Sequence, residues 1–192
     1  CVIVDKLNIL VVGVGGQGVV TLARLLSEAA YECSLNVLMS ETRGLSRRGG
    51  SVKVFLRIGK VYAPTFNNAD LLIGLELLET LRNISYVTNE TVIVVNNKLL
   101  LPSNVKYVIN EERVFETLRL RAKKLEIVDA ENIALKLGNI KSENMVMLGY
   151  ISSHSLLKNI RHCIEKAFYR SKYSKIRENI EAFEQGKQLK PI

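Results

Sequence analysis

Apolar and polar positions along the first two thirds of the chain predict strands that alternate with helices. Leu7–Val12 is an apolar run, interrupted only by Asn8, which is typical of a strand buried on both faces of a sheet, and Leu71–Leu75 is a further strand candidate. Val19–Ala30 is apolar almost all round and therefore predicts a buried helix. We expect further strands at Asn36–Ser40, Thr91–Asn96, Val105–Asn110 and Glu126–Asp129, and further helices at Glu76–Arg82, Glu111–Arg121 and Glu131–Leu137.

The connections between these elements predict the topology. The first strand, the glycine-rich turn, the first helix and Asn36–Ser40 form a unit that favours a right-handed crossover between parallel strands. Ser51–Ile58 instead alternates between apolar and polar positions. The turn dipeptide Gly59-Lys60 follows and leads into Val61–Ala63, so the pattern predicts a β-hairpin inserted in the α/β order.

Residues 142–192 show only helical patterns, with candidates at Ser142–Leu157, Ile160–Phe168 and Tyr173–Gln185. The last of these carries an apolar stripe that either packs in the core or contacts a partner subunit. We therefore expect one domain over residues 1–192: a three-layer α/β fold with a mostly parallel, Rossmann-like sheet, an inserted β-hairpin and a C-terminal helical segment.

Composition narrows the class of protein. Hydrophobic residues make up 47% and charged residues 24%, as in ordinary globular proteins. No apolar run approaches the roughly 18 residues of a membrane span, and no basic leader with an apolar stretch opens the chain. The net charge of +8 comes from scattered basic residues without a nucleic-acid-binding signature, so we expect a solvated basic surface.

The cysteines and histidines predict no metal site and no disulfide framework. Cys1, Cys33 and Cys163 lie far apart and form no C-x-x-C pair, which fits a reducing, cytoplasmic setting. Three thiols cannot supply a four-cysteine iron–sulfur cluster. His154 and His162 do not have the spacing of zinc ligands.

The first candidate site is the loop Gly13-Val14-Gly15-Gly16-Gln17-Gly18, which lies between a predicted strand and a predicted helix. Its Gly-x-Gly-x-x-Gly spacing matches the dinucleotide fingerprint, in which backbone amides at a helix N-terminus face an anion. Glu41 stands where such folds place an acidic residue, but arginines follow it. A phosphate-loop NTPase is excluded because Val19-Val20 occupies the Lys-Ser/Thr positions. Alone, the glycines fit a tight structural turn as well as a ligand cradle.

The second candidate site is residues 39–51, which contain Arg43, Arg47 and Arg48 among glycines. Guanidinium groups bind phosphates and carboxylates through paired hydrogen bonds. In a doubly wound sheet this loop lies at the carboxyl edge beside the glycine loop. The arginines therefore contact an anionic ligand or pair with another subunit, and the alternative is a solvated connection.

Together, the two loops resemble the gamma domain of 2-oxoacid:ferredoxin oxidoreductases. The matching residues are Gly13-Val14-Gly15-Gly16-Gln17-Gly18-Val19 and Ser40-Glu41…Gly44…Ser46-x-Arg48-Gly49-Gly50-Ser51-Val52. The second stretch is most similar to the beta subunit of the indolepyruvate type. Asn144-Met145-x-x-Leu148-Gly149 is similar to a further family stretch, so the resemblance covers essentially the whole chain.

The resemblance implies a division of labour between subunits. Such enzymes oxidatively decarboxylate a 2-oxoacid, pass electrons through iron–sulfur clusters to ferredoxin and release an acyl-coenzyme A. In the indolepyruvate type, the large subunit carries thiamine diphosphate, Mg and the 4Fe-4S clusters. The present chain has no Gly-Asp-Gly motif and no cysteine cluster, so we expect it to bind none of these groups alone. It is expected to be inactive by itself and to work in a heterodimer or heterotetramer, with coenzyme A as the co-substrate.

We expect the glycine loop to face the shared site or an anion, and the arginine loop to contact ligand or the large subunit; no residue is expected as a general acid or base. The candidate residues are Gly13, Gly15, Gly16, Gln17 and Gly18 in the first loop and Glu41, Arg43, Arg47, Arg48, Gly49, Gly50 and Ser51 in the second. Two alternatives remain open. One is the gamma subunit of a pyruvate, 2-oxoglutarate or branched-chain 2-oxoacid enzyme, and the other is a free-standing nucleotide-binding regulatory module.

Overall fold

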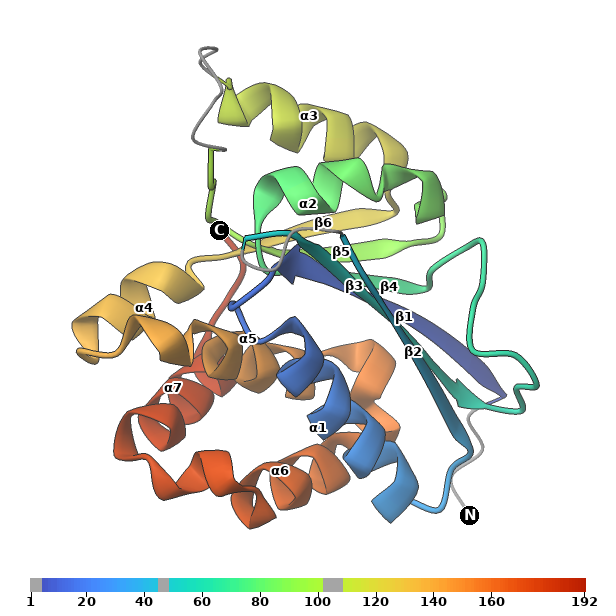
Figure 1. Cartoon of the computed structure of the whole chain (residues 1–192), viewed down its shortest axis with the longest axis vertical. Coiled ribbons are helices and arrows are strands. Elements are labelled where there is room, and N and C mark those ends of the chain that lie inside the picture. Colours follow the sequence, from blue (N-terminus) through green and yellow to red (C-terminus); the bar gives the residue numbers. More distant parts are fainter. Residues whose placement is uncertain (1–4, 45–48, 102–108) are drawn as a thin grey trace.

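The computed structural model describes residues 5–44, 49–101 and 109–192, and its centre is a six-stranded sheet (Figure 1). The strand order is β2-β3-β1-β4-β5-β6, and β1, β4, β5 and β6 run parallel. The strands are β1 (Lys6–Val14), β2 (Val37–Arg43), β3 (Ser51–Gly59), β4 (Leu71–Gly74), β5 (Val92–Asn96) and β6 (Lys124–Val128). The predicted α/β class with a mostly parallel sheet is confirmed.

Helices cover both faces of this sheet and give three layers. The helices are α1 (Val19–Glu32), α2 (Leu77–Arg82), α3 (Glu111–Arg121), α4 (Ala130–Lys136), α5 (Glu143–Ser152), α6 (Arg161–Arg170) and α7 (Arg177–Gln188). Short 3-10 turns lie at Ile84–Tyr86, Ile140–Ser142, Ser155–Ile160 and Lys172–Lys175. In Figure 1, α2 and α3 lie on one side of the sheet, and α1 and α4–α7 lie on the other.

Alternate side chains of β1 point into the two hydrophobic cores on opposite faces of the sheet. Ile9 and Val11 point into the larger core beneath α1 and the C-terminal helices. Leu10 and Val12 point into the smaller core beneath α2 and α3. All four side chains are fully buried, which explains why four successive positions of the strand, Ile9 to Val12, are apolar.

The predicted partner of the inserted strand is wrong. β3 does not form a hairpin with Val61–Ala63, which contains no strand, but pairs antiparallel with both β2 and β1. Its nine-residue register with β1 runs from Ser51 to Gly59, and it buries far more apolar surface than a three-residue partner offers. β1 and β2 still run in the same direction, as predicted, but β3 lies between them. The inserted hairpin is therefore β2–β3, and the arginine loop joins its strands.

The predicted helical C-terminal segment is confirmed. The last helix begins at Arg177 rather than Tyr173, because Lys172–Lys175 is a 3-10 turn and Ile176 has an extended backbone. Of the apolar stripe predicted there, Phe183 is fully buried and stacks on Phe168, whereas Ile176 remains exposed. The stripe therefore packs mainly in the core.

One predicted strand lies mostly beyond what the structure describes. Residues 105–108 of the Val105–Asn110 prediction are outside the described residues. Asn110 is described, and its side chain accepts a hydrogen bond from the Arg113 amide at the start of α3. Among the described helices, none combines the length and apolar character needed to cross a bilayer.

The expectation that the cysteines stay unpaired is wrong. Cys33, which directly follows α1, and Cys163 on α6 form a disulfide, with 6.1 Å between their Cα atoms. The two residues are 130 positions apart in the sequence, and they meet because α6 packs against α1. Spacing along the chain carries no information about such a tertiary contact.

Candidate functional site

The glycine loop joins β1 to α1 and depends on two glycines with positive φ. Gly16 has φ 106° and Gly18 has φ 84°, both in the left-handed region that favours glycine. The Gln17 amide donates to the Val14 carbonyl at 3.1 Å and closes the turn. A Cβ atom at Gly13 would lie 2.9 Å from both Gln17 Oε1 and Val19 Cγ2. Three of the predicted glycines are therefore required by backbone geometry or close packing.

The Gln17 side chain fixes this loop from inside. Its Oε1 accepts a hydrogen bond from the Val14 amide at 2.7 Å, and its Nε2 donates to the Leu75 carbonyl at 3.2 Å. Both bonds join the loop to the carboxyl ends of neighbouring parallel strands. Gln17 is therefore a positioning residue, because its side chain is engaged by the protein.

The arginine loop lies against the glycine loop, as predicted. The Gly15 amide donates to the Gly50 carbonyl at 2.8 Å, and the Gly44 amide donates to the Ser51 carbonyl at 2.8 Å. The Ser51 hydroxyl donates to Glu79 Oε2 at 2.5 Å, and Glu79 also pairs with Arg82 on α2. The Ser51 side chain is thus part of a contact with α2.

A shallow pocket of about 270 Å³ opens at the N-terminus of α1. Among the described residues, no side chain caps the first turn of α1, and that turn contains no acidic residue. Its free amides and the helix dipole favour an anion. The pocket is lined by Val14, Gly15, Gly16, Gly18, Val19, Val20, Thr21, Arg43 and Val52.

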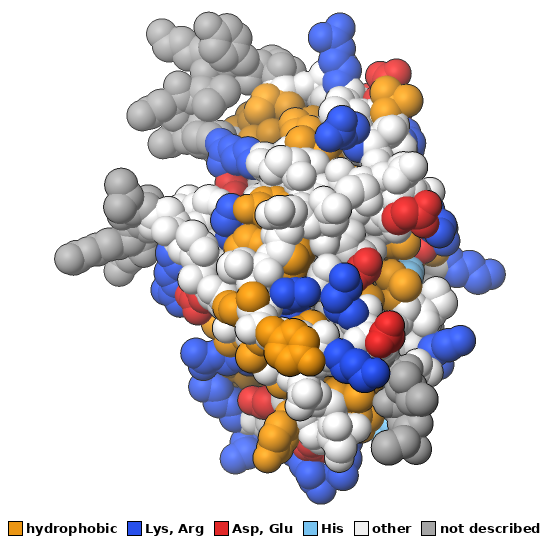
Figure 2. Space-filling model, turned by 90° about the vertical axis from the view of Figure 1, so that its right-hand side faces the viewer, with side chains coloured by type: hydrophobic (Ala, Val, Ile, Leu, Met, Phe, Trp, Pro, Cys, Tyr) orange, Lys and Arg blue, Asp and Glu red, His pale blue; other side chains and the backbone are white. Residues whose placement is uncertain are grey.

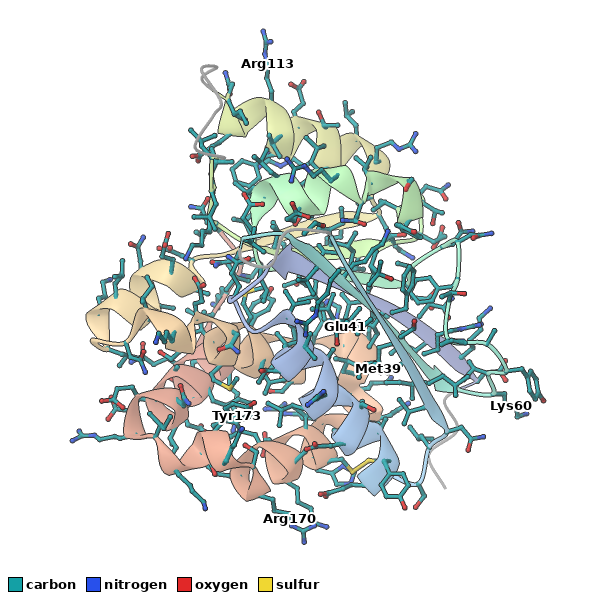
Figure 3. The ribbon with its side chains drawn as sticks, viewed as in Figure 1. Met39, Glu41, Lys60, Arg113, Arg170 and Tyr173 are labelled. Atoms are coloured by element: carbon teal, nitrogen blue, oxygen red, sulfur yellow. A yellow bond between two sulfur atoms is a disulfide. The ribbon has the colours of Figure 1, made fainter. Side chains whose placement is uncertain are left out.

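Arg43 supplies the cationic side chain described in this pocket. Its guanidinium pairs with Glu41 two residues earlier on β2, and about two thirds of the side chain is exposed. Figure 3 shows Glu41 and Met39 along β2. Glu41 does not line the pocket itself, so it acts on the pocket through Arg43.

The structure brings together part of the predicted site. Gly15, Gly16, Gly18 and Arg43 line one pocket, and the Gly50 carbonyl accepts a hydrogen bond from the Gly15 amide without lining the pocket itself. Gly13, Gln17 and Ser51 are packed or bonded inside the fold instead. Gly49 has φ 69°, and a Cβ atom added there would meet no described atom within 4 Å, so it lies in open space. Arg47 and Arg48 are outside the described residues.

Two residues beside the pocket were missed as site residues. The Asn144 side chain packs so closely on Gly18 that any Cβ atom there would overlap its amide group. Thr21 lines the pocket, and its hydroxyl lies 3.4 Å from the Tyr173 hydroxyl. Asn144 occurs in a family-like stretch, but nothing in the sequence predicts its contact with the glycine loop.

A buried ion-paired cluster supports the same edge of the sheet. Lys98 Nζ lies 2.9 Å from both Glu131 Oε1 and Glu143 Oε2. Burial raises the pKa of Glu143, although Lys98 partly opposes the shift. The fully buried Asn96 donates to Glu143 and to the Leu75 carbonyl, which Gln17 also contacts. The glycine loop is therefore joined through Leu75 to the start of α5.

A second polar cluster lies at the β6 edge of the sheet, in a hollow of about 530 Å³. Buried Glu126 accepts hydrogen bonds from Tyr150 at 2.6 Å and from Lys124 at 2.6 Å, and His154 Nε2 lies 3.5 Å away. Burial alone would raise the pKa of Glu126, but these partners outweigh it and hold the pKa below its usual value. Burial and the bond to Glu126 raise the pKa of Tyr150.

The basic residues do not form one continuous patch on the face drawn in Figure 2. There, Lys and Arg side chains lie scattered among hydrophobic and uncharged surface. For the whole molecule, the solvated basic surface expected from the sequence stays a prediction.

The sequence matches the family model described as pyruvate ferredoxin/flavodoxin oxidoreductase over residues 8–189. The indolepyruvate oxidoreductase subunit IorB of Archaeoglobus fulgidus is 37% identical over 190 residues, which span 94% of each chain. The pyruvate/ketoisovalerate oxidoreductases common subunit gamma of Pyrococcus furiosus is 32% identical over 165 residues, which span 81% of this chain and 80% of that relative.

Solved structures share the fold. Subunit PORC of the pyruvate oxidoreductase from Thermotoga maritima has a TM-score of 0.64 at 24% identity, over 95% of this chain and 93% of that chain. The 2-oxoglutarate:ferredoxin oxidoreductase of Magnetococcus marinus, solved with 2-oxoglutarate, coenzyme A and succinyl-CoA bound, has a TM-score of 0.73 at 20% identity. That match covers 96% of this chain and 31% of the longer chain. Because the family model spans nearly all of the sequence, this chain belongs to the pyruvate ferredoxin/flavodoxin oxidoreductase family.

Proposed function

We propose that this chain is the small subunit of a cytoplasmic indolepyruvate (arylpyruvate):ferredoxin oxidoreductase, with residues 1–192 forming one gamma-type domain. The observation that carries the proposal is the 37% identity to the IorB subunit of Archaeoglobus fulgidus across 94% of both chains. The match to the Pyrococcus furiosus gamma subunit is weaker and covers less of each chain. The indolepyruvate type is therefore favoured over its pyruvate relatives.

The proposal assigns thiamine diphosphate, Mg and 4Fe-4S clusters to a large partner subunit. The present sequence has three cysteines, and the structure places two of them in a disulfide, so it does not fit a four-thiolate cluster. It also lacks a Gly-Asp-Gly motif. Thiamine diphosphate and the clusters, when bound by the partner, supply the decarboxylation and electron-transfer chemistry. This chain contributes binding and positioning.

The residues of this chain fit the binding of an anionic group, and coenzyme A is the candidate. The amides at the N-terminus of α1 and the Arg43 guanidinium converge on one pocket with no acid in the first turn. Glu41 holds Arg43 at the pocket rim, and Gln17 keeps the glycine amides in place. The related Magnetococcus marinus structure contains coenzyme A, which supports this choice.

Arg43→Ala tests this binding role. Loss of a charge-assisted contact to phosphate should raise the KM for coenzyme A about tenfold to a hundredfold in the assembled enzyme. Arg24→Ala, on the exposed side of α1, is the matched control and should leave the KM within about twofold. If instead the KM is unchanged and association of the subunits weakens in a salt-dependent way, Arg43 contacts the partner. If neither constant changes, the pocket is not a binding site.

The subunit assignment is tested by purification from the native host. An antibody or affinity tag on this chain should bring down one large thiamine- and iron-containing chain together with arylpyruvate-oxidising activity. Several smaller partners and a preference for pyruvate, 2-oxoglutarate or branched-chain 2-oxoacids would support the gamma-subunit alternative. Recovery of the chain without any partner, together with tight NAD(H) or FAD binding, would support a free-standing nucleotide-binding regulatory module.

A further inference from the structure

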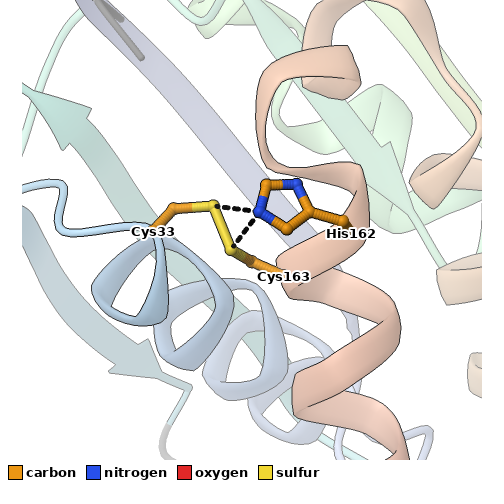
Figure 4. Close-up of side chains that lie close together, drawn as sticks. All are labelled: Cys33, His162 and Cys163. Atoms are coloured by element: carbon orange, nitrogen blue, oxygen red, sulfur yellow. Dashed lines mark hydrogen bonds between the residues drawn. A yellow bond between two sulfur atoms is a disulfide. The ribbon is translucent and has the colours of Figure 1, made fainter. Parts of the chain in front are cut away.

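The Cys33–Cys163 disulfide lies beside a histidine at the outer end of α1, remote from the residues of the glycine-loop pocket. His162 directly precedes Cys163 on α6, and its ring faces both sulfur atoms (Figure 4). His162 Nε2 lies 3.3 Å from Cys163 Sγ and 3.7 Å from Cys33 Sγ. Two sulfurs and an imidazole thus form one cluster that the proposed oxidoreductase function does not use.

The two sulfurs differ in accessibility. Cys163 is only 3% exposed, within the core shared by α1 and α6, whereas Cys33 is half-buried at the end of its helix. Cys33 does not line the nearby surface hollow of about 760 Å³, but its sequence neighbours Glu32 and Ser34 do, together with Lys166 and Arg170 on α6. Arg170 lies at the periphery of the molecule in Figure 3. An external thiolate can therefore approach Cys33 but not Cys163.

His162 is placed to serve the buried sulfur. Its ring is exposed to solvent, yet its Nε2 is nearer to Cys163 Sγ than to Cys33 Sγ. When a disulfide is attacked at one sulfur, the other sulfur leaves as a thiolate. The exchange is faster when that leaving thiolate is stabilised. A proton donor beside Cys163 therefore favours attack at Cys33.

We propose that Cys33, Cys163 and His162 form a thiol–disulfide exchange site whose substrate is a dithiol reductant. A thiolate of the reductant attacks Cys33 Sγ, the Cys33–Cys163 bond breaks, and Cys163 Sγ leaves with the electron pair and takes the proton from His162 Nε2. The second thiolate of the reductant then attacks its own sulfur in the mixed disulfide. Cys33 is released as a thiolate and is protonated by solvent. Two electrons pass from the dithiol to the cysteine pair, and the reductant becomes a disulfide.

The exchange changes how α1 is anchored. The disulfide joins the C-terminal end of α1 to α6, while the N-terminal end of α1 carries the glycine loop. Its removal releases a cross-link that spans 130 residues. Cross-links of this span stabilise proteins strongly, so the midpoint of thermal unfolding should fall by roughly 5–15 °C on reduction.

The site of attack is tested on the full chain in a Cys1→Ser background. The oxidised protein is exposed to the monothiol glutathione under native conditions, quenched with acid and alkylated, and the modified cysteines are located by mass spectrometry. The proposal expects glutathione on Cys33 and an alkylated thiol on Cys163. Glutathione on Cys163, two free thiols before any reductant is added, or a disulfide that resists dithiothreitol until the protein unfolds would each overturn it.

The role of His162 is tested by the rate of reduction with dithiothreitol. His162→Asn should slow reduction about tenfold or more while the oxidised protein keeps its thermal midpoint, because a positioned proton donor accelerates such steps. His154→Asn is the control, since His154 contacts Glu126 and none of the described sulfurs. A rate in His162→Asn within twofold of the parent would contradict the assignment of the proton donor.

Discussion

Gln17 lies in the middle of the glycine loop, but its side chain points into the fold. It satisfies the Val14 amide and the Leu75 carbonyl, two backbone groups at the ends of β1 and β4. Backbone groups in such positions cost free energy when they are left unpaired. The geometry of the candidate anion site therefore depends on a residue that does not contact the anion.

Gln17→Leu should destabilise the protein. Loss of both hydrogen bonds removes the Gln17 partner of the half-buried Val14 amide and leaves the Leu75 carbonyl with its long 3.5 Å bond from Asn96, which costs about 1–3 kcal/mol in the free energy of unfolding. Urea unfolding measures this cost. Gln188→Leu, at an exposed position near the end of α7, should change stability by less than about 0.5 kcal/mol. If both variants lie within that limit, the Gln17 side chain does not hold the loop.

Glu126 predicts a pH dependence of stability. Its partners Lys124, Tyr150 and His154 hold its pKa in the folded state below the usual value, despite burial. A depressed acid pKa contributes stability that is present above the unfolded pKa of about 4.3 and is lost as the pH falls through the folded pKa.

Tyr150→Phe removes one of these partners. It should lower the free energy of unfolding by about 1.5–3 kcal/mol at pH 7, because the lost hydrogen bond is to a charged carboxylate. The difference from the parent should shrink as the pH falls through the depressed pKa of Glu126 in the folded protein, because the carboxylate is then protonated. Tyr62→Phe, at a side chain that is 98% exposed, should have no effect at any pH. A Tyr150→Phe penalty that stays constant from neutral to acid pH contradicts this account.

Single residues of the site were only partly predictable. The tight turn at the glycine loop was predictable from the sequence, but which of its glycines adopt positive φ, Gly16 and Gly18, was not. The use of the Gly15 amide by Gly50 and the inward turn of Gln17 were not predictable either, because each depends on a tertiary partner. The contact of Asn144 with Gly18 was not predictable for the same reason.

At the scale of elements, α5 and α7 cross at two glycines. A Cβ atom at Gly149 would overlap the Phe183 carbonyl, and one at Gly186 would overlap the Val146 carbonyl. The helix backbones therefore pack together without intervening side chains. This close crossing fixes the C-terminal segment on the larger core.

Gly149→Ala should destabilise the protein, although a glycine-to-alanine change in a helix usually stabilises it. In a free helix the substitution stabilises by about 1 kcal/mol. Here the added methyl group must separate two helices, and we expect a loss of about 1–3 kcal/mol or more in the free energy of unfolding. Gln185→Ala, on the exposed side of α7, controls for helix propensity and should be nearly neutral. A stabilised Gly149→Ala protein would show that the crossing is loose.

Most helices and strands were predictable from the periodicity of apolar residues, and the wrong predictions share one cause. The helix at Glu111–Arg121 was predicted with its observed bounds, since its capping residue and charges are local. The partners of β3 and the pairing of Cys33 with Cys163 were not, because they link segments that only the completed fold brings together. Local turn chemistry at Gly59-Lys60 suggested a hairpin, but long-range pairing with β1 outweighed it.

At the scale of the whole molecule, the described part of the candidate anion site offers the first amides of α1 and the Arg43 guanidinium as binding groups. The glycine and arginine loops meet at one edge of the sheet, where doubly wound folds bind ligands. The fold class was predictable because alternating strands and helices allow few arrangements. The residues that a partner subunit would add to the site were not predictable, since this chain supplies only one side of the proposed shared site.

The most direct test of the central claim is the specificity of the reconstituted complex. The large subunit is assayed with and without this chain for coenzyme A-dependent ferredoxin reduction, with indolepyruvate, pyruvate and 2-oxoglutarate as substrates. The account predicts that activity requires this chain, and that kcat/KM for indolepyruvate exceeds the other two values by at least about tenfold, or about 1.4 kcal/mol in transition-state binding. Full activity of the large subunit alone, or a kcat/KM that favours pyruvate or 2-oxoglutarate, would contradict it.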